Sequence, residues 1–550
     1  MHIHITDYLN VYSDSFAVHL ALKELNDGDV LHLDGKKLRI DNSFATAQRY
    51  FLPRYSNECK YYAFYIENKK NIIIDGDGAE LVFLGDVAPF GFDNCENITV
   101  KNFTVDYEIP YFWQAYITES CDEYFEVVFD ENEFPCKYDQ ERKLFIFGKK
   151  EENNYWESAY SLACEVEESG KIALNSDRYF FCTDKPHPIY RSMSTVYDCQ
   201  PIGENSFRFS YKDNPKHYSK GNYLVLADHS RKNCNFHFHR CKNIFMDSID
   251  MYNSASFGNV FLLCENISAN NVNSIIKPNT NRKLAVNADH FHCVNTKGTI
   301  KISNCIMSNM FDDGVNFHTL FATVEKKLDE HTILLKFSYL AKKVLNIFSP
   351  DEKICLLNSE TFEKYDDYTV KKCDFAGDYH LLLETKEVLK DIVENSFVES
   401  VDAKATAYIT GCTTNNATRG MLVTPGKNVL IEDCVFCNAS CGIFLNGASR
   451  IYCEGTAVDG LTVKNCNFEN CAYLYPETPA ILVIPRDITK GDSMYHKNLT
   501  ISNNIFKDGK TAVKALRTEN LILKNNEWNR IENGDLFCST EICKNVQSDI

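Results

Sequence analysis

Two adjacent carboxylates stand in the segment Met-Phe-Asp-Asp-Gly-Val-Asn-Phe-His, residues 310–318. Asp312 and Asp313 lie between apolar residues, and Asn316 and His318 follow closely. A third acid, Asp289, precedes Asp312 by 23 positions. An acidic pair alone is more typical of a solvated turn. A catalytic interpretation therefore requires a chain path that brings Asp289 beside the pair.

Three carboxylates in one place would have a definite chemistry. Close carboxylates repel one another, so the pKa of at least one rises, and one acid can hold a proton while another stays ionised. Glycoside hydrolysis needs such a set, because one acid protonates the leaving oxygen and one or two carboxylates activate water. A separation of roughly 6.5–9.5 Å inverts the anomeric centre, whereas about 5 Å retains it. The sequence does not give this separation.

Other sites are compatible with the same residues. Clustered aspartates bind calcium, although calcium takes more oxygen ligands than we can place here. His290, His292 and His318 with one aspartate would form a zinc site. We favour histidines that orient carboxylates or donate hydrogen bonds to sugar hydroxyls. Arg282 lies just before this cluster and is either a surface cation or a clamp on a sugar hydroxyl or carboxylate.

A repeated phrase indicates the fold that would bring these acids together. Each copy is a short segment of alternating apolar and polar residues followed by a turn with Asn, Asp or Gly, and this period of two is typical of strands. Two matched copies begin at Cys241 and Cys264, which gives 23 residues per unit. Stacked units of this size predict a right-handed parallel β-helix of the all-β class, with coils about 4.8 Å apart. An antiparallel sandwich with coincidental spacing is the alternative. The copies begin at Asn68, Cys95, Cys241, Cys264, Lys297, Gly426, Gly460, His496 and Thr518.

Segments that lack the repeated strand phrase divide the chain into predicted domains. The helical spacing of apolar residues from Ser13 predicts an N-terminal helix that caps the open end of the β-helix. Two β-rich, barrel-like modules are predicted as insertions that frame a binding cleft, and Trp113 in the first is either a sugar platform or a core residue. The predicted division is 1–107 for the cap and first coils, 108–228 for the first module, 229–320 for the central coils with the site, 321–400 for the second module and 401–550 for the last coils.

Composition narrows the partners and the compartment. The net charge of −18 disfavours nucleic acid and polyanionic substrates such as pectin. The chain has no basic start followed by an apolar run, as a signal peptide would have, and no stretch of about 18 apolar residues, so we expect no membrane span. The 23 cysteines are an odd number, and many lie in strand-like segments, which predicts reduced thiols and a cytoplasmic protein.

The same segments resemble a known family. NRKLAVNADHFHCVNTKGTIKISNC from Asn281 and MFDDGVNFHT from Met310 are similar to the core of glycoside hydrolase family 110, the exo-acting α-1,3-galactosidases. The resemblance continues from Ala417, Gly442 and Pro479, and therefore covers most of the chain from about residue 229. It implies a parallel β-helix with barrel-like insertions and an inverting hydrolase that removes terminal α-1,3-linked galactose without a metal or other cofactor.

The resemblance also implies roles for residues. The catalytic trio falls on Asp289, Asp312 and Asp313, with Asp312 as general acid and the other two as the pair that activates water. The expected sugar contacts are Arg282, His292, Asn316, His318 and Glu454. The chain departs from the family pattern at Ala448 and Tyr452, so we expect a different outer pocket. A polygalacturonase-like hydrolase and a non-catalytic glycan-binding β-helix remain as alternatives, and a homodimer is compatible with the fold.

Overall fold

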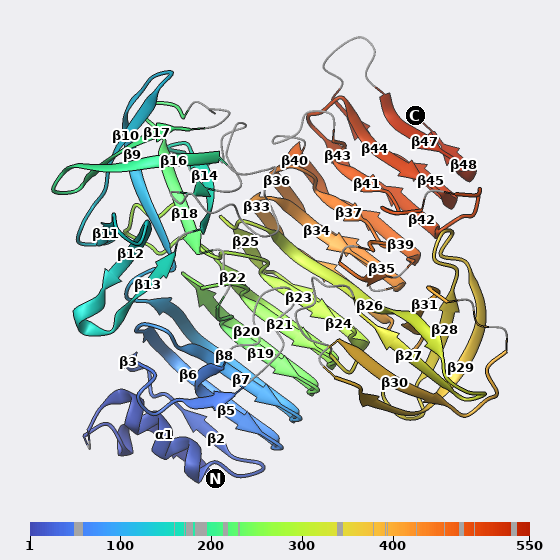
Figure 1. Ribbon diagram of the computed structural model, residues 1–550, viewed down its shortest axis with the longest axis horizontal. Helices are drawn as coiled ribbons and strands as arrows, with labels where there is room; N and C mark the ends of the chain where they lie inside the picture. The colour runs from blue at the N-terminus through green and yellow to red at the C-terminus, as the bar shows by residue number, and fades with distance from the viewer. Residues whose placement is uncertain are drawn as a thin grey trace.

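Parallel coils stacked along one axis make up most of the molecule in the computed structural model (Figure 1). The N-terminal coils lie at one end of the stack and the C-terminal coils at the other. The structure describes residues 1–550 except 11, 49–58, 159, 170, 172–179, 182–194, 213–217, 229–231, 338–344, 378, 391, 393, 425, 451, 456, 472–477, 489, 530–535 and 550.

Three rows of parallel strands form the walls of the β-helix, which confirms the predicted fold. The first row is β2 (Val30–His32), β6 (Lys70–Phe83), β8 (Glu96–Tyr107), β20 (Lys242–Met251), β22 (Glu265–Ser274), β24 (Lys297–Ser303), β32 (Ala405–Thr410), β35 (Gly426–Glu432), β39 (Asp459–Lys464), β42 (His496–Ser502), β45 (Thr518–Lys524) and β48 (Lys544–Ser548). The second row is β5 (Lys60–Glu67), β7 (Ala88–Asp93), β19 (Phe236–His239), β21 (Asn259–Leu262), β23 (Phe291–Val294), β26 (Asp313–Lys327), β34 (Arg419–Val423), β37 (Ile443–Leu445), β41 (Ile481–Val483), β44 (Thr511–Leu516) and β47 (Leu536–Glu541). The third row is β25 (Ile306–Ser308), β33 (Thr413–Ala417), β36 (Val435–Ala439), β40 (Asn467–Cys471), β43 (Ile505–Phe506) and β46 (Glu527–Trp528).

The repeated phrase explains why the coils stack in one register. Alternate apolar side chains point inward and pile up, as in the stacked rings of Phe436, Phe468 and Phe506, whose centroids lie 4.8 and 4.7 Å apart. Columns of this kind, together with Ile, Leu and Val side chains, pack the interior of the β-helix. Cys241 and Cys264 belong to a buried thiol column, and each Sγ donates to a carbonyl of the preceding coil.

Asparagines at the turns hold neighbouring coils together. Asn97, Asn243 and Asn266 all have positive φ, a conformation that asparagine tolerates better than most residues. The Asn243 amide donates to the Asn97 oxygen at 2.8 Å, and the Asn266 amide donates to the Asn243 oxygen at 3.0 Å. The sequence phrase thus encodes both the bend of each coil and its bond to the next.

The N-terminal end is covered as predicted. Helix α1 (Asp14–Glu24) begins at Ser13, whose side chain accepts a hydrogen bond from the Phe16 N–H. The buried face of α1 contains Ala17 and Val18 and packs into the main core. Short elements complete this end: β1 (His2–His4), the 3₁₀ turn Ile5–Asp7, β3 (Lys37–Ile40) and β4 (Thr46–Gln48). In the described part of the chain, no helix is long and apolar enough to cross a membrane.

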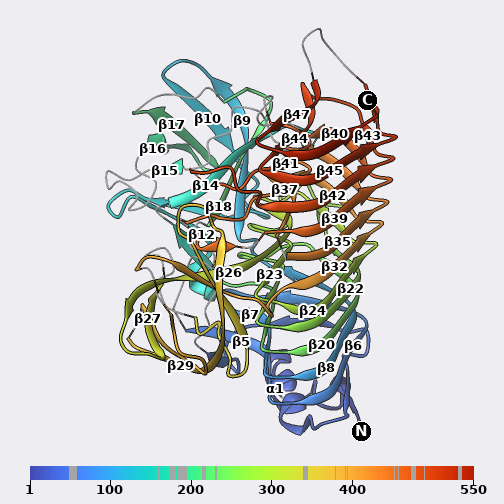
Figure 2. The same cartoon turned by 90° about the vertical axis from the view of Figure 1, so that its right-hand side faces the viewer.

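Two β-rich modules project from the side of the β-helix that carries β23 and β26 (Figure 2). The first contains a closed barrel, and Trp113 packs in its core with Phe129 and Phe207, so Trp113 is a core residue. The barrel strands are β9 (Phe112–Ser120), β10 (Tyr124–Val128), β14 (Tyr160–Val166), β15 (Phe180–Phe181), β16 (Thr195–Gly203), β17 (Ser206–Tyr211) and β18 (Tyr223–Asp228). A small sheet of β11 (Cys136–Asp139), β12 (Leu144–Lys149) and β13 (Asn154–Ser158) accompanies it, with the 3₁₀ turn Lys150–Glu152.

The second module begins with the far half of β26, because this strand extends beyond the β-helix. The far half of β26 pairs with antiparallel strands around a separate apolar core. These strands are β27 (Thr332–Lys336), β28 (Lys353–Leu357), β29 (Lys364–Phe375), β30 (His380–Thr385) and β31 (Phe397–Ser400). Both modules fall within the predicted insertions, whose exact boundaries stay a prediction.

Three buried histidines should make the fold sensitive to acid. Burial lowers the pKa of His237 to about 3 and the pKa values of His290 and His496 to about 4. The unfolded chain takes up protons below about pH 6.5 and the folded chain does not, so stability falls as the pH drops through this window. We expect a loss of about 2 kcal/mol per histidine between pH 6.5 and pH 5.

Urea unfolding at pH 7 and pH 5 measures this slope. His496→Gln should flatten it, whereas His2→Gln, at an exposed position, should not. An equal slope in wild type and His496→Gln would contradict the assignment.

Candidate active site

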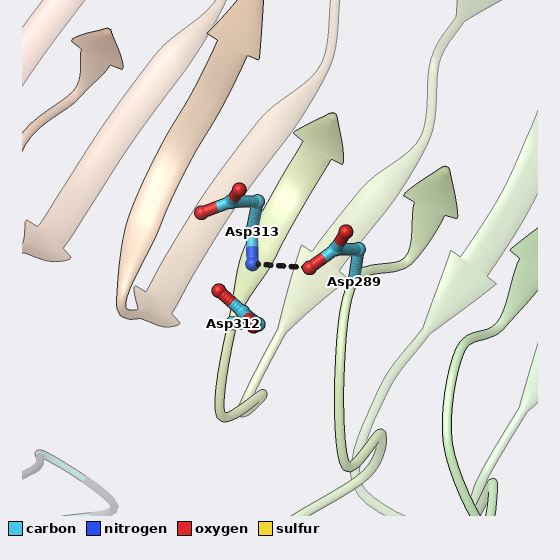
Figure 3. A group of neighbouring side chains, drawn as sticks. All are labelled: Asp289, Asp312 and Asp313. Atoms are coloured by element: carbon cyan, nitrogen blue, oxygen red, sulfur yellow. Dashed lines mark hydrogen bonds between the residues drawn. The ribbon is translucent and has the colours of Figure 1, made fainter. Parts of the chain in front are cut away.

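The three predicted aspartates meet where β26 begins. The preceding turn places Asp289 one coil before Asp313, and the Asp313 N–H donates to Asp289 Oδ1 at 3.1 Å. Each of the three side chains offers one oxygen, and these oxygens lie within 4.8 Å of one another (Figure 3). The predicted stacking of Asp289 on the acidic pair is therefore present in the structure.

The register differs from the predicted one by a single residue. Phe291 pairs with Val315, so the coil is 24 residues long here, and Asp289 matches Asp313. Asp312 lies in the same turn, one residue before Asp313. It is also the most accessible acid of the three, with 14% of its side chain exposed against 2% for Asp289 and none for Asp313.

An arginine that the sequence analysis missed completes the cluster. Arg419, the first residue of β34, lies beside Asp313 in the next coil. Its Nε donates to Asp313 Oδ1 at 2.5 Å and its Nη2 donates to Asp313 Oδ2 at 2.8 Å, while Nη2 lies 3.4 Å from Asp312 Oδ1. Bidentate pairs of this geometry are among the strongest charge-assisted hydrogen bonds.

Burial and charge act in opposite directions on this pair. Burial is the main cause that raises the pKa of Asp313 well above its usual range, and the charges of Asp312 and Asp289 add to it, whereas Arg419 lowers it. Burial acts to lower the pKa of Arg419, but the same three carboxylates together outweigh it and raise this pKa, so the guanidinium stays charged. Three carboxylates against one guanidinium leave an excess of negative charge, which favours retention of a proton in the cluster.

Polar residues of β23 and β26 support the trio. His292 Nδ1 lies 2.6 Å from Asp289 Oδ2, and the Asn316 amide donates to Asp313 Oδ2 at 3.1 Å. His318 Nδ1 lies 3.0 Å from Asn316 Oδ1, and the rings of His292 and His318 are 5.1 Å apart. These three predicted sugar contacts thus lie on β23 and β26, next to the turns that carry Asp289 and Asp312, and all three are buried.

Arg282 lies in a different environment from the one expected for a sugar clamp. Its side chain is 4% exposed, and it donates to Asp106 at 2.7 Å and to Glu133 at 3.0 Å. Asp106 is on β8 and Glu133 belongs to the first module, so Arg282 bridges that module to the β-helix. A side chain held by two carboxylates has little surface left for a sugar, and the predicted clamp gains no support.

Glu454 lies in β38 (Glu454–Gly455), which pairs with the middle of β26. Leu320 of β26 is its register partner, and Glu454 is 3% exposed. Glu454 therefore lies beside Leu320, further along β26 than Asp313, where the second module begins.

The trio fits an ion pair better than a metal. Its oxygens are close enough to ligate one cation. The guanidinium of Arg419, however, already binds both oxygens of Asp313, and its positive charge opposes a second cation. Neither a calcium nor a zinc centre is therefore favoured by these side chains.

Glycines follow Asp313 and Arg419 in successive coils, and neither position has room for a Cβ. A Cβ on Gly420, which follows Arg419, would lie 2.3 Å from Gly442 O and 2.6 Å from Phe436 Cδ1. Gly420→Ala should therefore destabilise the fold by roughly 1–3 kcal/mol through overpacking.

Thermal unfolding tests this expectation. Gly203→Ala is the matched control, because its nearest atom would be Ser206 Oγ at 3.5 Å. Equal melting temperatures for the two variants would contradict it.

Comparison with known proteins gives relatives along most of the chain. The α-1,3-galactosidase B of Bacteroides thetaiotaomicron is 27% identical over 459 residues, which cover 81% of this chain and 71% of the relative. The α-1,3-galactosidase A of Shewanella woodyi is 24% identical over 466 residues, which cover 83% of this chain and 73% of the relative. The chain is a homologue of these α-1,3-galactosidases. The predicted resemblance and the predicted class of enzyme, a glycoside hydrolase, are thereby confirmed.

Other comparisons add less. The α-1,3-galactosidase B of Akkermansia muciniphila is 25% identical, and the chain spans 56% of its length. No family model matches the chain. Among solved structures, the family 28 exopolygalacturonase of Yersinia enterocolitica has a TM-score of 0.42 at 10% identity, covering 99% of this chain and 78% of that one. An exopolygalacturonase from Thermotoga maritima has a TM-score of 0.37 at 12% identity, covering 100% and 92%. At these scores the likeness carries no argument about activity.

Proposed function

We propose that this protein is an exo-acting glycoside hydrolase that removes terminal α-1,3-linked galactose with inversion at the anomeric carbon. The observation that carries the proposal is the trio of Asp289, Asp312 and Asp313, with oxygens within 4.8 Å of one another, in a homologue of α-1,3-galactosidases. General acid–base chemistry on a glycosidic bond uses such a set.

Asp312 is the proposed general acid. Asp313 is paired with the Arg419 guanidinium, and Asp289 accepts the Asp313 N–H on one oxygen and lies against His292 on the other. The raised pKa of Asp313 belongs to this coupled set of carboxyl groups as a whole. Within the set, the N–H donors on Asp313 and Asp289 favour their ionised forms, so we place the retained proton on Asp312. Asp312 is also the acid with the most accessible side chain, as contact with a leaving oxygen requires.

Asp289 is the proposed base, and Asp313 is proposed to hold Asp289 in position. The prediction had both residues contact the water, but Asp313 has no exposed surface and faces Arg419, so we assign it to positioning. Its backbone N–H holds Asp289, and its carboxylate holds the guanidinium. The attacking water would be polarised by Asp289, which Asp313 keeps in place.

The close spacing does not argue for retention. The distance rule for the two mechanisms assumes acid and nucleophile on opposite faces of the sugar. Retention needs a carboxylate oxygen that bonds to the anomeric carbon, and the side chains of Asp289 and Asp313 are 2% and 0% exposed. A water molecule needs far less room than a sugar carbon, and water attack inverts the centre.

A neutral sugar suits the site better than a uronate. Arg419, the cation that contacts Asp312 and Asp313, already neutralises Asp313 and would be needed there. Recognition of a uronate would require a further cation against an excess of negative charge. The choice between linear α-1,3-galactosyl glycans and the branched blood-group-B type is left to experiment.

A panel of substrates tests the proposal. Purified protein would be incubated with α-1,3-, α-1,4- and α-1,6-linked galactosyl disaccharides, a branched blood-group-B trisaccharide and polygalacturonate, with galactose and reducing ends quantified. Release of galactose from α-1,3-linked substrates alone is expected. Release of galacturonate, or no hydrolysis of any galactoside, would overturn the proposal.

A further inference from the structure

Arg419 is the cation paired with Asp313, so its position affects which aspartate of the trio is ionised. It reaches the trio from the following coil, whereas Asp312 and Asp313 share one turn. Two of its nitrogens bind the two oxygens of Asp313, and its guanidinium carbon lies 5.6 Å from the centre of the Phe444 ring. The side chain is thus held from two sides while 23% of it remains exposed.

We propose that Arg419 is a positioning residue that pairs with Asp313 and thereby leaves the shared proton of the site on Asp312. Two adjacent carboxyl groups, those of Asp312 and Asp313, compete for this proton. Asp313 has no exposed surface, and without a counter-charge a buried carboxylate of this kind takes up a proton. Asp313 would then be the neutral acid of the cluster, in a place where it cannot reach a leaving group.

The groups around Arg419 are consistent with this role. Asp312 and Asp313 face it from the start of β26, and Asp289 faces it from the preceding coil. On the following coil the Cys441 thiol lies near it, and burial raises the pKa of this thiol to about 12, so it stays neutral. Arg419 is therefore the cation that balances Asp313, and its contact with Asp312, from Nη2 to Oδ1, is longer at 3.4 Å.

This inference extends the proposed function to a residue that acts through its neighbour. The consequence for catalysis rests on the proposed function, whereas the location of the proton does not. A protonated Asp312 can donate to the leaving oxygen, and a protonated Asp313 cannot.

Infrared difference spectra locate the proton without any substrate. Protein labelled with ¹³C-aspartate would be measured at neutral pH, and the C=O stretch of neutral carboxyl groups would be compared between variants. With Arg419 intact, the band of the wild type should be absent from the spectrum of Asp312→Asn and present in that of Asp313→Asn. In the Arg419→Met background the dependence should reverse, while Arg419→Lys, which keeps the charge, should retain the wild-type pattern.

Two outcomes would overturn the inference. One is a wild-type band that disappears in Asp313→Asn and not in Asp312→Asn. The other is a band that stays on Asp312 in Arg419→Met. The first comparison uses the intact arginine, so it decides the matter even if Arg419→Met fails to fold.

A kinetic readout separates positioning from a general loss of structure. Aryl α-galactosides whose phenols differ in acidity depend on the general acid to different degrees. Arg419→Met should lower kcat more for poor leaving groups than for good ones, and Arg419→Lys should restore most of this difference. An equal loss for all leaving groups would indicate a structural role and contradict the inference, whereas a wild type inactive on every galactoside would instead refute the proposed function.

Discussion

Asp312→Asn should lower kcat on an α-1,3-galactosyl disaccharide by roughly 10²–10⁴-fold, the usual contribution of a general acid. The amide cannot protonate a leaving sugar oxygen, and its similar size should leave the turn intact. KM should change little, because the lost interaction forms as the glycosidic bond breaks. With an aryl α-galactoside whose phenolate leaves without protonation, the loss should be much smaller.

A matched control distinguishes this effect from a general effect of removing a charge. Asp433→Asn replaces an exposed turn aspartate of another coil, at a residue with φ of 54°. It should keep wild-type kcat on both substrates. Full activity of Asp312→Asn on the disaccharide would show that another group supplies the proton.

Asp289→Asn should be impaired on both kinds of substrate. Water must be activated however well the leaving group departs, so we expect a fall in kcat of roughly 10²–10⁴-fold for the disaccharide and the aryl galactoside alike. The Asn side-chain oxygen can still accept the Asp313 N–H, which lies 3.1 Å from Asp289 Oδ1. The fold should therefore survive, and circular dichroism would verify this.

The control for Asp289→Asn is another aspartate that accepts a hydrogen bond from a neighbouring coil. Asp250 accepts a hydrogen bond from the Asn273 amide at 2.8 Å on β20, away from the trio. Asp250→Asn should leave kcat unchanged. If Asp289→Asn kept activity on the aryl galactoside while losing the disaccharide, Asp289 would be the acid, and the two assignments would have to be exchanged.

The repeat made most of the fold predictable. A phrase with apolar residues at alternate positions and Asn at the turns encodes both the strand and the bend, and its recurrence encodes the stacking. Asp289 could be found for the same reason, because one coil length separates it from the acidic pair. The prediction placed it beneath the pair Asp312-Asp313 with a coil of 23 residues, and the observed coil of 24 residues puts it level with Asp313.

Arg419 was missed because the second module interrupts the repeat. The insertion places Asp313 and Arg419 106 residues apart, although they are neighbours in adjacent coils. A signal was present: ISNCIMSN from Ile302 and ITGCTTNN from Ile409 are similar phrases, and they lead to Asp313-Gly314 and Arg419-Gly420. Alignment of these two dipeptides would have predicted that Arg419 lies beside Asp313 in adjacent coils.

Arg282 shows the opposite case, because its observed partners lie outside the trio. It was assigned to the site because it is close in sequence to Asp289. Its partners are Asp106 and Glu133, which come from an earlier coil and from the first module. Such long-range partners follow from how the module docks, and no local pattern encodes that.

The most direct test of the account is to follow the anomer of galactose that is released first. Proton NMR of an α-1,3-galactosyl disaccharide during early hydrolysis separates the two anomers before they equilibrate. The account predicts that β-galactose appears first, because water held by Asp289 attacks opposite the leaving group that Asp312 protonates. Initial appearance of α-galactose would contradict it, and so would the absence of released galactose.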